Sequence, residues 1–334
     1  MADLSTHFAG LKLKNPLVVG ASPFSRNLEL SRLLEDQGAA GIVMYSLFEE
    51  EVTNEQLATD HFLNVGTESQ PEAQTYLVEP PVMEDKAERY MDQIRALKSA
   101  LSIPVIASLN GFSKSGWVSL ASRMEAAGAD AVELNLYSVV TDPDVSSEQV
   151  VQGYLEMMRQ VRSHTKLPLA IKISSHFKDL PRVLKLASET GVDGFVLFNR
   201  FLQPDIDIEK MTVNLKARLS TSDDLAQSIV WTAIVSPEID KDIVVCSGVH
   251  TAQDVVKAVM AGGCAVTMVS ELIKHGPRAV GKVLSDLNAW MDMHNYPDIN
   301  SMRGAMARGR GEHSIAYERR NYMQALQSYN ENLL

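Results

Sequence analysis

The chain has 334 residues, and its 42 acidic and 31 basic side chains give a net charge of −11. This length allows one large α/β domain or two medium ones, and the acidic balance disfavours binding to nucleic acid or to an anionic membrane surface. Its two cysteines, Cys246 and Cys264, exclude a disulfide framework and a cysteine-rich metal centre.

The first twenty residues lack the basic start and apolar core of a signal peptide. No apolar stretch further along approaches the length of a membrane span. We therefore expect a cytoplasmic protein without a membrane partner.

Eight short apolar runs recur along the chain, and most are followed by an amphipathic helical stretch. They are rich in Val and Ile and do not alternate with polar residues, which is typical of parallel strands buried on both faces. Glycines after the helices fit left-handed helix C-caps. The repeated unit predicts a (β/α)8 TIM barrel. The predicted strands are Leu17–Gly20, Gly41–Tyr45, Val105–Ser108, Ala131–Leu136, Leu169–Ile173, Gly194–Phe198, Ile243–Cys246 and Ala265–Val269.

Three segments exceed a minimal barrel. Ser5–Lys14 precedes the first strand and is expected to form a small hairpin at the bottom of the barrel. Leu47–Asp85 and Arg200–Lys241 follow strands two and six, and they are predicted to be long loop excursions on the active face.

The chain beyond Tyr296 forms a C-terminal extension. It begins irregularly and then has a helical pattern from about Ala316 to Gln327. Since no low-complexity linker interrupts the sequence, we expect a barrel over residues 1–295 and an extension over residues 296–334 packed on or near it.

Lys172 lies near the C-terminal end of the otherwise apolar fifth strand. A buried lysine costs several kcal/mol unless it meets an anion or a hydrogen-bonding partner. Because the C-terminal strand ends carry the chemistry of (β/α)8 barrels, Lys172 is the best candidate for a functional residue. The alternative is a strand-end lysine whose ammonium reaches solvent.

Nucleotide and metal motifs are missing from the sequence. There is no GxGxxG after the first strand and no GxxxxGK[ST], so Rossmann and P-loop hypotheses have no support. The eight histidines show no metal-ligand spacing, and we assign no metal site.

Short motifs at the strand ends, taken together, resemble the dihydroorotate dehydrogenase family. The resemblance extends from about Leu4 to Met291, and it is greatest to the "dihydroorotate dehydrogenase-like" proteins. The motifs are Asn15-Pro16-Leu17-Val18-Val19-Gly20-Ala21-Ser22-Pro23, Ser46-Leu47-Phe48-Glu49-Glu50, Ser108-Leu109-Asn110-Gly111, Glu133-Leu134-Asn135-Leu136, Thr141-Asp142-Pro143-Asp144, Ala170-Ile171-Lys172, Phe198-Asn199, Cys246-Ser247-Gly248-Val249 and His275-Gly276-Pro277.

The resemblance implies an FMN-dependent oxidoreductase of pyrimidine biosynthesis, in which a small substrate passes a hydride to the flavin. Lys172 matches the lysine near flavin N1 and O2, where a cation stabilises the reduced flavin. Asn135 is expected among the catalytic, flavin and substrate contacts, and Asn199 at a substrate amide. The remaining expected flavin contacts are Ala21, Ser22, Tyr45 and Asn110 around the ring, and Ser247, Gly248, Val269 and Ser270 around the phosphate.

Several positions depart from the family pattern. Tyr45 replaces a second lysine, and a phenol supplies no positive charge. Ser138 stands where the family has its catalytic base, but Val139 and Val140 replace the Pro-Asn that holds substrate. Glu271 introduces a carboxylate beside the expected phosphate, which is repulsive unless it turns toward a cation.

Arg200 follows Asn199 where a small polar residue would help to bind orotate. Together with Tyr45, Val139 and Val140, it predicts that dihydroorotate is not the substrate. Two other hypotheses stay open. One is a redox-inactive barrel that serves as a binding protein or subunit, and the other is an enzyme in which Lys172 forms a Schiff base. The expected partners are a small-molecule substrate and either a second copy or a larger redox assembly.

Overall fold

The structure is a computed structural model. It describes residues 2–53, 85–111, 113–136, 139–200, 204–214 and 218–309, together with Tyr317, Met323 and Gln327, except for the side chains of Lys114 and Ser115.

Eight parallel strands close into a barrel, so the predicted (β/α)8 fold is confirmed. The strands are β3 (Leu17–Val19), β4 (Gly41–Val43), β6 (Val105–Asn110), β7 (Ala131–Leu136), β8 (Leu169–Ile173), β9 (Gly194–Leu197), β12 (Asp242–Val245) and β13 (Ala265–Met268). Closure comes from parallel pairing of β13 with β3 and of β4 with β6.

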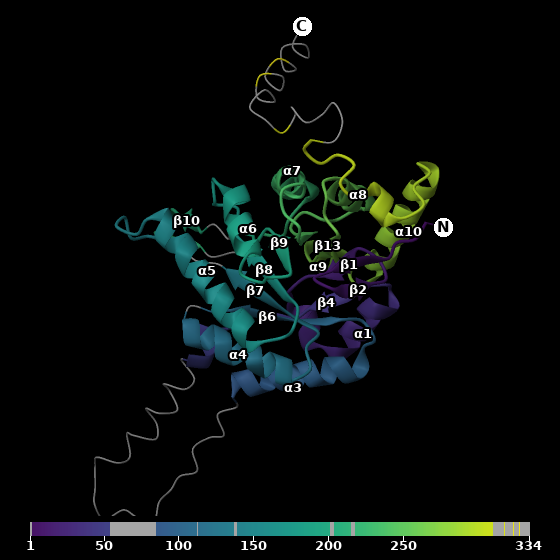
Figure 1. Ribbon diagram of the computed structural model, residues 1–334. Helices are drawn as coiled ribbons and strands as arrows, with labels where there is room; N and C mark the ends of the chain where they lie inside the picture. The colour runs from purple at the N-terminus through teal and green to yellow at the C-terminus, as the bar shows by residue number, and fades with distance from the viewer. Residues whose placement is uncertain are drawn as a thin grey trace, which may run out of the picture.

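Helices surround the strands in chain order, as Figure 1 shows. They are α1 (Leu28–Asp36), α3 (Lys86–Ala100), α4 (Lys114–Ala126), α5 (Ser147–His164), α6 (Leu180–Ser188), α7 (Leu225–Val235), α8 (Ala252–Met260) and α10 (Arg278–Met293), with short helices η1 (Pro23–Arg26), η2 (Ser222–Asp224), α9 (Ser270–His275) and α11 (Ile299–Met302). Residues at the helix ends satisfy free backbone groups. Thr251 and Asp254 form a capping box on α8, and the glycines that follow α1, α4, α6 and α8 have positive φ angles.

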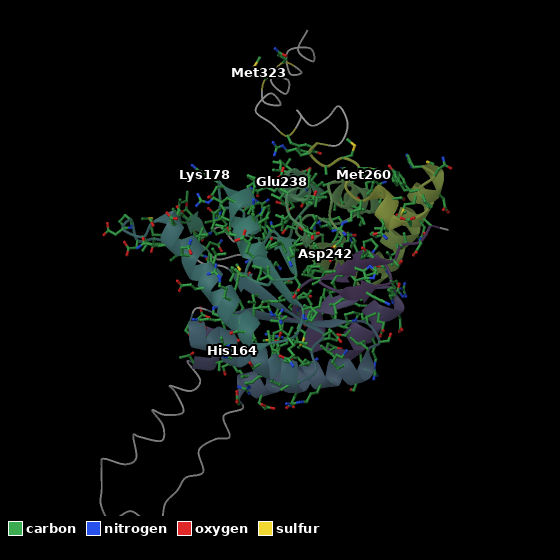
Figure 2. All side chains as sticks on the ribbon, viewed as in Figure 1. His164, Lys178, Glu238, Asp242, Met260 and Met323 are labelled. Atoms are coloured by element: carbon green, nitrogen blue, oxygen red, sulfur yellow. The ribbon has the colours of Figure 1, made fainter. Side chains whose placement is uncertain are left out.

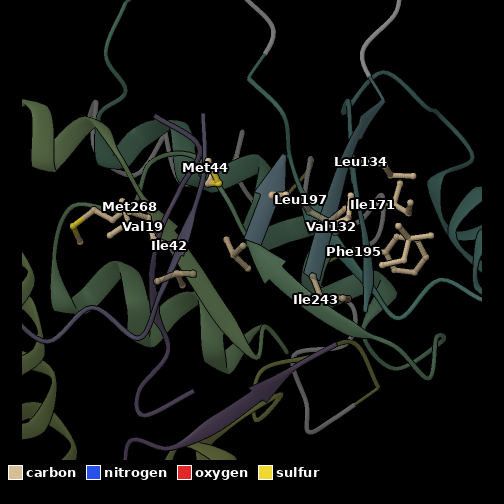
Figure 3. Close-up of a cluster of buried hydrophobic side chains, with 14 of the residues drawn as sticks. Val19, Ile42, Met44, Val132, Leu134, Ile171, Phe195, Leu197, Ile243 and Met268 are labelled. Atoms are coloured by element: carbon tan, nitrogen blue, oxygen red, sulfur yellow. The ribbon is translucent and has the colours of Figure 1, made fainter. Parts of the chain in front are cut away.

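The barrel strands bury both faces because each separates two apolar layers. Outward-facing side chains such as Ile42, Leu134 and Phe195 pack under the helices (Figure 3). Inward-facing side chains such as Val18 and Val196 fill the lower barrel. Each large side chain removed from water in this way contributes about 1.5–3 kcal/mol, so the barrel forms a rigid support for its strand ends.

The expected hairpin before the first strand is present at the bottom of the barrel. β1 (Thr6–Phe8) and β2 (Leu11–Leu13) pair antiparallel. Phe8 and Leu13 pack with inward-facing barrel residues such as Ala170. This plug closes the end opposite the C-terminal strand ends, which are therefore the open face.

The two predicted excursions contain more regular structure than expected. After β4 the chain resumes as β5 (Leu47–Phe48), which pairs with the upper part of β6, and a helix begins at Glu49. In the second excursion, β10 (Asp205–Asp207) and β11 (Thr212–Asn214) form a hairpin. Leu225–Val235 is the barrel helix α7; it is apolar on most sides, so it lacks the amphipathic pattern that identifies a helix in sequence.

The first part of the extension packs on the barrel. Met306 N–H donates to the Met260 carbonyl at 2.9 Å, and an Arg308 guanidinium nitrogen lies 3.8 Å from Glu238 Oε1. Figure 2 labels Met260 and Glu238. Residues 296–309 thereby rest on α7 and α8. Most of the helix expected between Ala316 and Gln327 lies outside the described residues.

Candidate active site

Lys172 and Glu133 form an ion pair inside the upper barrel. The Lys172 Nζ lies 3.5 Å from Glu133 Oε1, and the two residues are 8% and 2% exposed. Side chains two apart on a strand share a face, so Asn135 on β7 points to the same side as Glu133. Asn135 also stands directly opposite Lys172 in the β7–β8 register. The barrel therefore positions an ammonium and an amide together at its open end.

Lys172 stays protonated in this environment. Burial by itself lowers the pKa of Lys172, but Cys246 and the Glu133 carboxylate outweigh burial, and the pKa lies above its ordinary value. The contact to Glu133 is longer than a usual charge-assisted hydrogen bond of about 2.7–2.9 Å. The ammonium has three N–H donors, so it retains capacity for a further acceptor.

Asn135 and Asn199 are brought together across the end of the barrel. The Asn199 Nδ2 donates to Asn135 Oδ1 at 2.8 Å, and the Asn199 backbone N–H donates to the Ile173 carbonyl at 2.8 Å. The bond between the two side chains fixes the orientation of both amide groups. It leaves the side-chain N–H groups of Asn135 as donors and the side-chain carbonyl oxygen of Asn199 as an acceptor. Such a pair suits an amide or imide group.

The first strand contributes Ala21 and Ser22 at the same open end. Ala21 is partly buried against the inward-facing cluster. Ser22 is 5% exposed, and its Oγ is buried without a hydrogen-bond partner. Because buried hydroxyl groups are rarely left unpaired, this atom marks a place where a ligand would supply the partner. Asn110, 7% exposed, ends β6 opposite Phe48.

Tyr45 lies in a different environment from the Lys172–Glu133 pair. Its ring meets the Tyr90 ring edge-on at 5.0 Å, and the Arg26 guanidinium lies 4.2 Å from the ring centroid. Burial raises the pKa of the Tyr45 phenol, and Arg26 and Arg89 offset part of that rise. The ring thus packs toward η1 and α3, and no contact in the described residues joins it to Lys172.

The expected phosphate end lies between the loop after β12 and helix α9. Ser247 and Gly248 have φ angles of +75° and +79°. A Cβ on Gly248 would lie 2.3 Å from the Leu225 backbone nitrogen, so only glycine fits this turn. Val269 packs over Gly20, where its Cγ2 would lie 2.8 Å from an added Cβ. The turn is therefore a tight backbone cradle.

Glu271 turns toward two histidines. Its Oε2 pairs with His250 Nδ1 at 2.9 Å and its Oε1 pairs with His275 Nδ1 at 2.8 Å. Both carboxylate oxygens are thus occupied by imidazole nitrogens. The repulsion expected between this carboxylate and a phosphate is therefore reduced.

His250 and Ser220 were missed in the sequence. Ser220 Oγ lies 3.1 Å from His250 Nε2, and the Ser220 N–H donates to Ser270 Oγ at 3.0 Å. His250 follows Gly248 by two residues, which was the available signal. Ser220 comes from the excursion after β9, and no local pattern identifies such a long-range contact.

Ser138 lies outside the described residues. Val139 and Val140, which follow it, are 56% and 47% exposed. They line a cavity of about 780 Å³ between α5 and α6, together with Phe177, and this cavity is separate from Lys172 and Asn199.

Arg200, the residue after Asn199, contacts the excursion that follows β9. Its Nη1 donates to the Arg218 carbonyl.

Two classes of feature are missing from the described part of the chain. No helix there is long and apolar enough to cross a bilayer. No group of three or more His, Cys, Asp or Glu side chains within it is arranged to hold a metal ion.

Comparison with known proteins supplies relatives over most of the chain. The family model for dihydroorotate dehydrogenase matches residues 80–291. The catalytic subunit of dihydroorotate dehydrogenase B (NAD(+)) from Thermoplasma acidophilum is 27% identical over 325 residues, covering 92% of this chain and 100% of the relative. The same subunit from Alkaliphilus metalliredigens is 22% identical, covering 91% and 99%. The NAD-dependent dihydropyrimidine dehydrogenase subunit PreA of Escherichia coli K12 is 24% identical, covering 90% and 76%.

Proposed function

Because the chain belongs to the dihydroorotate dehydrogenase family, we propose that it is an FMN-dependent oxidoreductase acting on a small amide-bearing molecule. The observation that supports this most is the buried Lys172, paired with Glu133, beside the Asn135–Asn199 pair at the open end of the barrel. A buried cation with spare donors calls for an anionic or strongly accepting ligand.

The residues present fit a flavin mononucleotide. The unpartnered Ser22 Oγ and the spare donors of Lys172 suit the acceptors on the edge of an isoalloxazine ring. The cradle at Ser247–Gly248 suits a phosphate, since positive φ angles present backbone N–H groups to one side. When bound, FMN would accept a hydride from the substrate.

The chain's own residues would prepare that transfer. Lys172 would hold positive charge where electron density develops, and Glu133 would fix the direction of its ammonium. Asn135 and Asn199 would orient the substrate through one donor and one acceptor. Ser138 stays the proposed base of the reaction.

Dihydroorotate itself is not the proposed substrate. Tyr45 faces α3, and the residues after Ser138 are two valines with exposed side chains. We expect dihydroorotate turnover with a dye acceptor to stay far below the ~1–10³ s⁻¹ typical of enzymes. A rate in that range would refute this part of the proposal.

The Schiff-base hypothesis is disfavoured by the charge of Lys172. An amine attacks a carbonyl only when deprotonated, and a lysine activated for this purpose has a lowered pKa. Cys246 and the carboxylate of Glu133 act in the opposite direction and raise the pKa of Lys172. Borohydride treatment with carbonyl compounds should therefore leave the mass of the protein unchanged.

A second protein is part of the proposal. The relatives described above are named as a catalytic subunit or as subunit PreA. We propose that this chain also passes its electrons to a partner subunit. The alternative, a redox-inactive barrel that serves as a binding protein or subunit, differs from this proposal because it requires no flavin.

The visible absorption spectrum of the purified protein tests the function. We expect flavin bands near stoichiometric occupancy after FMN is added to the protein and the excess is removed. The Lys172→Met variant should retain less flavin, whereas Lys185→Met, at an exposed position on α6, should behave as the parent protein. A colourless protein that fails to bind added FMN would refute the proposal.

A further inference from the structure

The cavity between α5 and α6 has the dimensions of a ligand site. The two helices lie side by side on the barrel (Figure 1). The cavity between them, of about 780 Å³, is closed by the chain segments that follow β7 and β8. Pockets that bind small molecules have volumes of about 300–1,000 Å³. The cavity is therefore large enough for a small molecule or for a substituent of one.

The lining of this cavity is mostly apolar. Val139, Val140 and Val145 line it, and their side chains are 56%, 47% and 38% exposed. Tyr154 and Phe177, whose rings meet edge-on with centroids 6.3 Å apart, add aromatic surface. Two acidic and two basic residues balance each other in the lining, and they are Glu148, Asp179, Lys178 and Arg182. Removing this apolar surface from water is favourable, so the lining selects an apolar group rather than a charged one.

The cavity borders the Asn135–Asn199 pair through the end of β7. Leu136 lines the cavity and directly follows Asn135. Successive side chains on a strand point to opposite faces, so Asn135 points into the barrel mouth and Leu136 toward the helices. Because consecutive Cα atoms are about 3.8 Å apart, the amide pair and the cavity lie on the two sides of one strand end. On β8, Ser174 lines the cavity two residues beyond Lys172.

The departure from the family pattern falls on the wall of the same cavity. Val139 and Val140 stand where the resemblance expects Pro-Asn to hold a polar substrate, and both line the cavity. A valine in place of an asparagine removes one hydrogen-bonding side chain and adds apolar surface. The substitution therefore favours a substrate with an apolar group at this end.

We propose that the cavity between α5 and α6 receives an apolar substituent of the substrate, and that the substrate is a cyclic amide or imide bearing a group of about phenyl size. The inference rests on the proposed function and adds the substrate class to it. The Asn135–Asn199 pair binds the amide, and the valines and Phe177 bind the substituent.

Binding of two matched imides to the FMN-loaded protein tests this inference. Glutarimide carries the imide alone, and β-phenylglutarimide adds one phenyl group to it. Isothermal titration calorimetry gives both dissociation constants without turnover. The glutarimide constant and the amount of FMN retained report whether the rest of the site is intact.

Two variants alter the cavity from different walls. Val145→Trp fills it from a partly exposed position, and Phe177→Ala removes part of its aromatic surface. The matched control is Val230→Trp on α7, because Val230 is 41% exposed against 38% for Val145 and lies outside the lining.

We expect the parent protein to bind β-phenylglutarimide about ten-fold or more tightly than glutarimide, as burial of a phenyl group predicts. Val145→Trp should lose most of this gain, and Phe177→Ala should lose about three-fold of it. Glutarimide affinity should change by less than about two-fold in every variant. Val230→Trp should match the parent protein for both imides.

Two results would overturn the inference while the proposed function stands. One is equal affinity of the parent protein for the two imides. The other is a gain from the phenyl group that Val145→Trp and Phe177→Ala both leave intact, which would place the ring outside the cavity. If Val145→Trp retains no FMN, Phe177→Ala decides the outcome. If the FMN-loaded parent protein binds neither imide, the amide-bearing substrate of the proposed function fails, and the inference fails with it.

Discussion

The two ends of the candidate site are built in different ways. At the ring end, Lys172, Glu133 and Asn135 lie on adjacent barrel strands, where the register fixes their separation. At the phosphate end, Ser220, His250 and Glu271 come from a loop excursion, a turn and a short helix. The ring end is thus positioned by the sheet, and the phosphate end by contacts between loops.

This difference determines how each end holds charge. Lys172 and Glu133 are almost fully buried, and the contact between them, at 3.5 Å, is longer than an ordinary hydrogen bond. At the phosphate end the carboxylate of Glu271 has two imidazole partners within 3 Å, one of them on a residue 63% exposed. The ring end is therefore more sensitive to loss of one partner, because a buried charge left alone costs several kcal/mol.

Lys172→Met should give the largest effect. It removes the cation from the ring end and leaves the Glu133 carboxylate buried and unpaired. We expect flavin reduction by a competent donor to slow about 10²-fold, the size of effect seen when one transition-state donor is removed. Stopped-flow absorbance measures the rate, and Lys185→Met is the control. Equal rates in the two variants would show that Lys172 is only a strand-end lysine.

Gly248→Ala should damage the phosphate end while sparing the ring end. The new Cβ meets the Leu225 backbone nitrogen at a φ of +79°, which we expect to cost about 1–3 kcal/mol or displace the turn. FMN affinity should fall with that displacement, while riboflavin affinity stays within about two-fold of the parent. Gly128→Ala serves as the control, because its φ is also positive and its Cβ meets no atom within 4 Å. If Gly248→Ala, but not Gly128→Ala, weakens the binding of both FMN and riboflavin, the two ends of the site are coupled.

The sequence predicts the ring end better than the phosphate end for a physical reason. A lysine in an apolar strand is informative because burial makes it costly, and parallel strand order then places Lys172 near Asn135. The His250–Glu271 and Ser220–His250 contacts join residues 21 and 30 positions apart, and contacts of this kind leave no local pattern in the sequence. Helix α7 was missed for another reason, since a helix that is apolar on most sides carries no periodic signal.

Tyr45 illustrates the limit of carrying a role over by position. The sequence places it where the resemblance expects a cation near the flavin. In the structure the chain after β4 turns and continues as β5, and the Tyr45 ring packs with Arg26 and Tyr90. Its assignment to the cofactor stays a prediction.

Glu133→Gln tests, through the pH dependence of flavin binding, how the ring end holds its charge. The pKa of Lys172 is raised, so the free energy that its charge contributes is fully present at neutral pH and is lost only as pH rises through the folded-state value. The parent protein should therefore show constant affinity between about pH 6 and 9 for riboflavin, which carries no phosphate. Without the carboxylate, only Cys246 opposes burial, so the pKa of Lys172 should fall from its raised value and riboflavin affinity should fall several-fold toward alkaline pH. A flat profile in Glu133→Gln would mean that Glu133 does not maintain the charge of Lys172.

Tyr45→Phe should give the smallest effect. The contacts of Tyr45 in the described residues belong to its ring and backbone, and phenylalanine keeps the ring against Tyr90 and under Arg26. We expect FMN affinity to change by less than about two-fold and stability by less than ~1 kcal/mol. Tyr90→Phe is the matched control, because the Tyr90 hydroxyl donates to the Ser108 carbonyl and accepts from the Ser108 N–H. Its loss leaves two buried backbone groups unpaired and should cost about 1–3 kcal/mol in chemical denaturation. If Tyr45→Phe instead weakens FMN binding ten-fold with unchanged stability, the phenol contacts the cofactor, and the ring end extends to β4 as the sequence predicted.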